Sequence, residues 1–128
     1  MKKRQSGVLM HISSLPGKYG IGSFGQSAYD FVDFLVRTKQ RYWQILPLGT
    51  TSYGDSPYQS FSAFAGNTYF IDFDILIEEG LLNEADVKGA DFGDDPRKVD
   101  YAKIFDARRP IMEKAVARFL KAEDLSDY

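Results

Sequence analysis

The amino-acid sequence predicts an α/β fold with parallel strands, because two short apolar runs are separated by one amphipathic helix. The first run, GVLMHI, covers Gly7–Ile12 between turn-forming residues, which is typical of a strand buried on both faces. The second run covers Tyr42–Leu46 and ends at Pro47. Strands joined through a helix have a crossover connection, so these two strands should be parallel.

The predicted helix lies in the stretch SAYDFVDFLVRTK, with Ser27 as its N-cap and apolar residues at helical spacing. Gly20, Gly22 and Gly25 precede it, spaced like the glycines of a dinucleotide-binding loop. Pro16 lies inside that loop, and no acidic residue closes the second strand at the required distance. We therefore favour tight-turn glycines over a nucleotide site.

The pattern beyond the second strand favours mainly helices. The stretch TYFIDFDIL, from Thr68, favours a short extended segment, and DILIEEGLL favours a short helix that breaks at Gly80. Residues 83–98 are polar and are predicted to be exposed and mobile, whereas Tyr101–Lys121 has a helical pattern interrupted at Pro110. Two strands are too few for a free-standing parallel sheet, so we expect these residues to begin a larger protein.

The composition argues against several classes of function. Of the 128 residues 44% are hydrophobic, which is enough for a core, and the net charge of −2 without long charged runs argues against a nucleic-acid partner. Cysteine is absent and there is one histidine, so disulfides and the usual zinc sites are not expected. The apolar runs are too short for a signal peptide or membrane span, which predicts a cytoplasmic protein.

The most unusual stretch is YGDSPYQSFSAFAGN, residues 53–67, where aromatic rings stand among small and polar residues. In a parallel α/β fold a loop that follows a strand lies on the functional face. We expect Phe61 and Phe64 to pack on the core and anchor this loop. Tyr53 and Tyr58 differ because their hydroxyls need partners.

Hydrogen-bonding side chains stand beside these two tyrosines, namely Asp55, Ser56 and Gln59. An aromatic face surrounded by carboxylate, hydroxyl and amide groups suits a sugar, whose apolar side can stack while its hydroxyls form hydrogen bonds. The residues alone therefore suggest a carbohydrate ligand.

Other polar residues have simpler interpretations. His11, at the end of the first strand, is expected to be a hydrogen-bonded core residue rather than a catalyst, because no nucleophile is paired with it in the sequence. Asp72 and Asp74 alternate along one segment and could share a face. We favour exposed carboxylates or helix caps over an acid and base pair.

The segments SGVLMHISSLPGKYGIGSFG, RYWQILPLG and YGDSPYQSFSAFAGN, together with VDYAKIFDARRPIMEKA, identify a family. From Ser6 to about Leu82 the chain resembles the N-terminal part of the 4-α-glucanotransferases, or amylomaltases, of glycoside hydrolase family 77. The resemblance implies the N-terminal portion of a (β/α)8 TIM barrel. Residues 1–49 would form the first strand, helix and second strand, residues 50–74 a glucan-facing loop, and residues 75–128 a helical insertion.

The resemblance implies transfer of an α-1,4-glucan segment to the 4-hydroxyl of a second glucan or of glucose, by a retaining mechanism and without a metal or organic cofactor. The catalytic carboxylates of the family lie beyond position 128, on the remainder of the same polypeptide. In this segment the resemblance assigns Ser56 and Tyr58, with Asp55 beside them, to the donor subsite. It assigns Tyr53 to a second glucan site, where Phe105 stands at a position that carries tyrosine in the family. A non-catalytic carbohydrate-binding module and a purely structural fragment remain alternatives.

Overall fold

The computed structural model describes residues 4–51, 56–60, 62 and 64–122. It divides the chain into two units, Met1–Ile71 and Asp72–Tyr128. Both strands belong to the first unit, and the long helix belongs to the second. The motif at residues 53–67 therefore lies wholly within the first unit.

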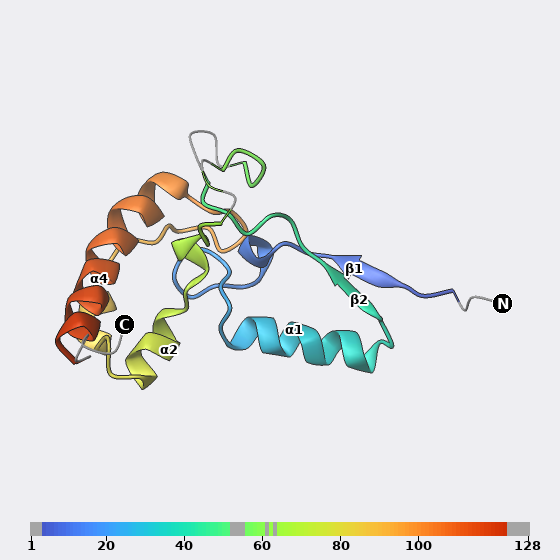
Figure 1. The fold of residues 1–128 in the computed structure, drawn as a ribbon, viewed down its shortest axis with the longest axis horizontal. Helices are drawn as coiled ribbons and strands as arrows, with labels where there is room; N and C mark the ends of the chain where they lie inside the picture. Colours follow the sequence, from blue (N-terminus) through green and yellow to red (C-terminus); the bar gives the residue numbers. More distant parts are fainter. Residues whose placement is uncertain (1–3, 52–55, 61, 63, 123–128) are drawn as a thin grey trace. The chain divides into compact units, whose positions relative to one another are not determined.

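The first unit is built on two parallel strands joined through a helix (Figure 1). Strand β1 (Gly7–Leu9) pairs with β2 (Tyr42–Gln44), and Val8 lies opposite Trp43 in the register. Helix α1 (Gln26–Arg37) is the crossover between them. This arrangement confirms the predicted order of strand, helix and strand and the parallel pairing.

Trp43 links the strands to the helix. Its indole N–H donates to the backbone carbonyl of Met10 at 2.7 Å, just beyond the end of β1. Its ring meets the Phe31 ring of α1 edge-on, with 4.9 Å between the ring centroids. A half-buried indole still needs a partner for its N–H, and here the hydrogen bond also connects the two strands.

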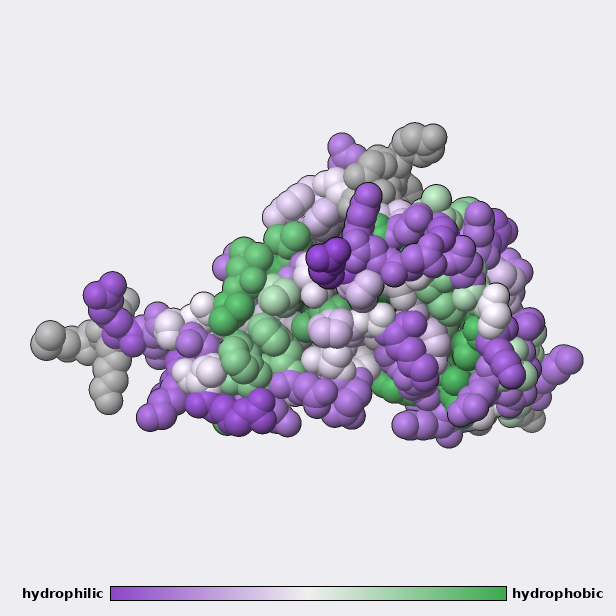
Figure 2. Space-filling view, turned by 180° about the vertical axis from the view of Figure 1, so that it is seen from behind, coloured by the Kyte–Doolittle hydropathy of each residue, from purple (hydrophilic) through white to green (hydrophobic). Residues whose placement is uncertain are grey.

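The prediction that the first strand is buried on both faces is wrong for this chain. Leu9 is 58% exposed, and the extended run stops at this residue because Ile12 begins a 3₁₀ helix, η1 (Ile12–Ser14). Figure 2 shows apolar side chains gathered on the surface of the first unit. The physical reason is that the described residues form a sheet of only two strands, so each strand keeps an uncovered edge.

Helix α1 begins earlier than its sequence pattern suggested. The N-cap is Gly25 rather than Ser27, and the carbonyl of Gly25 accepts the first helical hydrogen bond from the N–H of Ala28 at 3.0 Å. Gly25 is buried, so the chain turns into the helix inside the fold and not at the more exposed serine. Ser27 lies instead in the first turn of the helix.

Two glycines before α1 have the conformational role that the sequence suggested. Gly20 has φ +79, in the left-handed region that glycine adopts without strain. At Gly22 a Cβ atom would stand 2.0 Å from the carbonyl oxygen of Ile12, so the two backbone segments approach too closely for any side chain. These contacts favour the tight-turn interpretation over a nucleotide-binding loop.

The second unit consists of α2 (Phe73–Glu78), α3 (Glu84–Val87) and α4 (Tyr101–Ala122). The extended segment predicted from Thr68 is wrong, because a 3₁₀ helix, η2 (Thr68–Phe70), and then α2 occupy it. Asp72 caps α2 by accepting the backbone N–H groups of Asp74 and Ile75 at 2.9 and 3.3 Å. The interpretation of Asp72 as a cap is thus confirmed, and the cap explains why the chain turns helical here. Gly80, at φ +76, follows the end of α2 as expected.

Helix α4 runs through Pro110 without the predicted interruption. Its buried positions, Ile104, Ile111 and Ala115, fall on both sides of the proline along one face. Packing of this face compensates for the hydrogen bond that proline cannot donate. The buried guanidinium of Arg108 lies on the same helix, with its carbon 4.1 Å from the centroid of the Phe73 ring.

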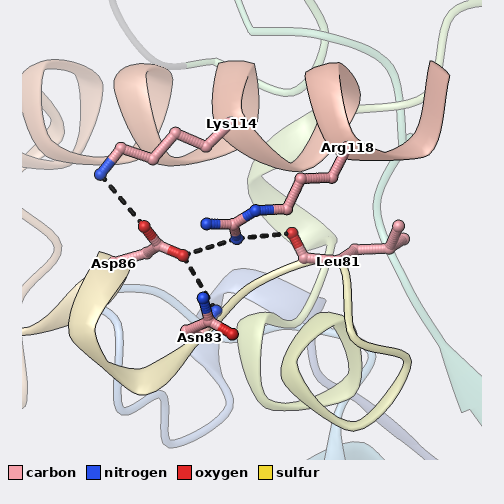
Figure 3. A network of polar contacts seen from close by, with 5 residues as sticks. All are labelled: Leu81, Asn83, Asp86, Lys114 and Arg118. Atoms are coloured by element: carbon pink, nitrogen blue, oxygen red, sulfur yellow. Dashed lines mark hydrogen bonds and ion pairs between the residues drawn. The ribbon is translucent and has the colours of Figure 1, made fainter. Parts of the chain in front are cut away.

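An ionic network ties α3 to α4 (Figure 3). Asp86 accepts from Arg118 at 2.6 Å and from Lys114 at 3.2 Å, and Arg118 also donates to the carbonyl of Leu81 at 3.0 Å. The hydrogen bond from Arg118, followed by that from the backbone N–H of Asn83, holds the pKa of Asp86 far below its usual value. The stretch 83–98 therefore contains a helix and an anchored carboxylate, and its mobility stays a prediction.

Candidate functional site

The loop that follows β2 is closed at its base by backbone contacts. Gly49 and Gly66 form an isolated antiparallel bridge, and the N–H of Asn67 donates to the carbonyl of Leu48 at 2.9 Å. The Asn67 side chain then accepts the N–H of Tyr69 at 3.0 Å, where it caps η2. The two ends of the motif loop are thus held together within the first unit, a few residues after the end of β2.

Within this loop a turn at residues 56–59 presents the predicted donor-subsite side chains. The carbonyl of Ser56 accepts the N–H of Gln59 at 3.1 Å, and the Ser56 hydroxyl oxygen accepts the N–H of Tyr58 at 3.3 Å. Tyr58 is 72% exposed, whereas Ser56 is half-buried. A hydroxyl that accepts one bond can still donate its own proton, so the turn offers an aromatic ring and a hydrogen-bond donor within two residues.

A cluster of hydroxyl groups, which the sequence reasoning missed, lies behind this turn. Ser60 Oγ donates to the carbonyl of Ser62 at 2.7 Å, accepts the Ser62 N–H at 3.3 Å and lies 3.2 Å from Thr50 Oγ1. A Cβ at Gly49 would meet Ser60 Oγ at 2.7 Å, so the serine rests against the base of the loop. The signal available in the sequence was a glycine and a threonine shortly after the strand, with two serines later in the same loop.

The structure bears differently on the other predicted residues. Tyr53, Asp55 and Phe61 lie outside the described residues, so their assignments stay predictions. Phe105 lies on α4 in the second unit and is 53% exposed. Phe64 is 100% exposed, so its predicted role as a core anchor of the loop is wrong.

The reason for the exposure of Phe64 lies in the hydrogen bonds of its turn. The backbone N–H groups of Phe64 and Ala65 both donate to Ser62 Oγ, at 3.3 and 3.1 Å. A polar side chain therefore closes this turn, and burial of the aromatic ring is not needed to hold it.

His11 confirms its expected role as a hydrogen-bonded core residue. Its Nδ1 accepts the backbone N–H of Leu46 at 3.2 Å, and its ring meets Phe70 edge-on at 5.3 Å. After β1, the N–H of Met10 still donates to the carbonyl of Gln44 at 3.0 Å. The hydrogen bond from Leu46 to His11 is the next one along, so it continues the connection between the two segments beyond the strands. Burial lowers the pKa of His11, and a protonated Nδ1 could no longer accept the N–H of Leu46.

We expect the folded state to lose stability as the pH falls below 6.5, the ordinary pKa of His11. Because the folded-state pKa is lowered, the unfolded chain binds more protons in this range, and the free energy of unfolding decreases with falling pH. An asparagine at this position supplies an acceptor that does not titrate. Thermal unfolding from about pH 7.5 to 5.5 should therefore show a smaller decrease in Tm for His11→Asn than for the wild type. Parallel decreases in the two proteins would show that His11 does not control this pH dependence.

The second unit contains a hollow whose charged residues are already paired. A hollow of about 450 Å³ in the second unit is lined by Asp86, Lys103 and Lys114 among others, and each of these charges is paired within the unit. Across the part of the chain that the structure describes, no cluster of three potential metal-ligating side chains occurs. No helix in that part is both long and apolar enough to cross a membrane.

Comparison with known proteins identifies the family of the chain. A family model described as 4-alpha-glucanotransferase matches residues 10–127, which is nearly the whole chain. The chain belongs to the 4-alpha-glucanotransferase family. Among curated 4-alpha-glucanotransferases, that of Streptococcus pneumoniae is 78% identical over 100% of this chain and 25% of its own length. That of Clostridium butyricum is 60% identical over 91% of this chain and 24% of its own length.

A solved structure agrees with this assignment to the 4-alpha-glucanotransferase family. Amylomaltase from Streptococcus agalactiae, in complex with acarbose, superposes with a TM-score of 0.92 at 63% sequence identity. The match covers 98% of this chain and 25% of that chain. The chain thus spans about a quarter of the length of the relatives that it matches.

Proposed function

We propose that this chain supplies the N-terminal quarter of a 4-α-glucanotransferase, which transfers an α-1,4-glucan segment to the 4-hydroxyl of a second glucan or of glucose. The observation that carries the proposal is the family match over residues 10–127 together with a loop that presents Tyr58 and Ser56 after the second strand. The fold would be the first part of a (β/α)8 barrel, for which the parallel β1–β2 pair and α1 provide the initial unit. Maltooligosaccharides and glycogen or starch in the cytoplasm would be its substrates.

In this proposal the present residues hold the donor glucan and do not cleave it. The ring of Tyr58 would stack on the apolar side of a glucose unit, and the hydroxyl of Ser56 would donate to one of its oxygens. Asp55 would accept from a glucose hydroxyl, and Tyr53 with Phe105 would form the second glucan site. The acarbose complex of the Streptococcus agalactiae relative supports a glucan ligand, because acarbose is a mimic of such a chain. Cleavage and transfer would need two carboxylates from the rest of the polypeptide.

The proposal is tested with the product of the complete reading frame that contains these residues, called here the full-length enzyme. Incubated with maltotriose, the full-length enzyme should yield glucose and longer maltooligosaccharides, whereas residues 1–128 alone should yield none. A full-length enzyme without transfer activity that still binds maltooligosaccharides would indicate a carbohydrate-binding protein instead. Transfer by residues 1–128 alone, above the level of an empty-vector preparation, would contradict the placement of the catalytic groups.

A further inference from the structure

We propose that Ser60 is a positioning residue, which holds the turn at residues 56–59 in the orientation that binds the donor glucan. The inference rests on the proposed function and assigns a task to a side chain that does not itself contact the sugar. Three observations carry it, namely the saturated hydroxyl of Ser60, its contact with the base of the loop and its place next to the turn.

The hydroxyl of Ser60 has no capacity left for a ligand. A serine hydroxyl donates one hydrogen bond and accepts two. Its proton goes to the carbonyl of Ser62 at 2.7 Å, and its oxygen accepts the Ser62 N–H at 3.3 Å. The remaining acceptor position lies 3.2 Å from Thr50 Oγ1, which must then be the donor of that pair. The Ser56 hydroxyl differs, because among the described residues the N–H of Tyr58 is its one partner, so the proton of Ser56 has no acceptor within that part of the chain.

The contact with Gly49 and Thr50 makes Ser60 a tether. These two residues stand at the start of the loop, five and six positions after the end of β2 at Gln44, and Gly49 is fixed to Gly66 by the bridge at the base of the loop. A Cβ added to Gly49 would lie 2.7 Å from Ser60 Oγ and 2.9 Å from Ser60 Cβ, so the serine fills the space over the glycine. Ser60 is therefore held against the base of the loop, although it comes from the far side of the turn.

The tether acts on the turn through a short covalent path. Only Gln59 separates Ser60 from Tyr58 in the sequence, and the N–H of Gln59 is bonded to the carbonyl of Ser56. The side chain of Tyr58 is 72% exposed. The backbone of the turn sets the point and direction from which this side chain leaves the chain, and Ser60 fixes that backbone at one end. Displacement of a substrate-positioning group by about 1 Å can cost a large part of an enzyme's rate.

The test compares variants of the full-length enzyme in disproportionation of maltotriose. Ser60→Ala should lower kcat/KM by roughly 3- to 10-fold, the effect of one hydrogen-bonded contact. Thr50→Ala removes the other partner of the tether and should act in the same direction, whereas Thr50→Ser keeps the hydroxyl and should restore most of the rate. Thr68→Ala, which removes an exposed hydroxyl from η2 in the same unit, is the matched control and should leave kcat/KM unchanged.

A double variant distinguishes positioning from a general structural role. If Ser60 acts through Tyr58, adding Ser60→Ala to Tyr58→Ala should cause a smaller loss of kcat/KM than Ser60→Ala causes in the wild type, because one of the groups being positioned is already absent. Equal losses from Ser60→Ala in both backgrounds would overturn the inference, as would an unchanged rate for Ser60→Ala alone. If Tyr58→Ala itself leaves the rate unchanged, the proposed donor subsite fails and the positioning role fails with it. A deleterious Tyr58→Ala beside a harmless Ser60→Ala leaves the proposed function intact and removes only the positioning role.

Discussion

Replacing Phe73 by alanine should destabilise the second unit by about 3–5 kcal/mol, because the ring is fully buried and a cavity would remain in its place. Phe73 is 0% exposed, stands in the first turn of α2 and lies beneath the guanidinium of Arg108 on α4. Removal of the ring would deprive Arg108 of its contact as well as opening a void. Hydrogen exchange of the α4 amides in the full-length enzyme measures this local opening directly.

A Phe73→Leu variant separates apolar volume from the aromatic ring. Leucine keeps most of the buried volume and loses the contact between the ring and Arg108. The loss of stability should then be smaller than for Phe73→Ala, because a smaller cavity remains. If Phe73→Ala increased the hydrogen-exchange rates of the α4 amides less than Phe73→Leu does, the ring would not be the element that joins α2 to α4.

Replacing Tyr58 by alanine in the full-length enzyme should lower kcat/KM by about 1–3 kcal/mol of transition-state stabilisation. One stacked or hydrogen-bonded contact with the donor glucan would be lost, while the protein should remain folded because the ring is 72% exposed. Steady-state disproportionation of maltotriose, with Tm as a check on folding, measures both effects. A Tyr58→Ala enzyme as fast as the wild type would remove Tyr58 from the donor subsite.

Two further variants make the result specific. Tyr58→Phe keeps the ring and removes the hydroxyl, so a rate near that of the wild type would assign the effect to stacking. Tyr29→Ala removes a similarly exposed tyrosine, 64% exposed on α1, and should have no effect on kcat/KM. A comparable loss from Tyr29→Ala would indicate that exposed tyrosines affect the enzyme in general.

Much of the first unit could be predicted because its determinants are local. The apolar runs at β1 and β2 and the helical spacing of α1 are visible in consecutive residues, and the crossover between them implies parallel pairing. The N-cap of α1 at Gly25 could not be predicted from consecutive residues. A good capping residue, Ser27, was present two positions later, and burial of the turn decided between them.

The region after the motif was harder to predict because short apolar runs do not distinguish strands from helices. In TYFIDFDIL the aspartates at positions 72 and 74 suggested the alternation of polar and apolar residues that is typical of a strand. In the structure the Asp72 side chain instead caps α2 at its N-terminus. Pro110 gave a strong local signal for a break in α4, and tertiary packing of Ile104 and Ile111 outweighed it.

The order of the amino acids was enough to identify the family of this protein and the residue types in the loop at residues 53–67, since both depend on which side chains follow one another in the chain. Only the tertiary structure decided that Phe64 is exposed and that Ser60 is tied to Thr50 at the base of the loop. These features depend on contacts between residues that the chain brings together after folding back on itself. A serine hydroxyl can donate to a ligand or to a backbone carbonyl, and the sequence does not distinguish the two. The groups that lie around it in the folded chain determine which of these hydrogen bonds it forms.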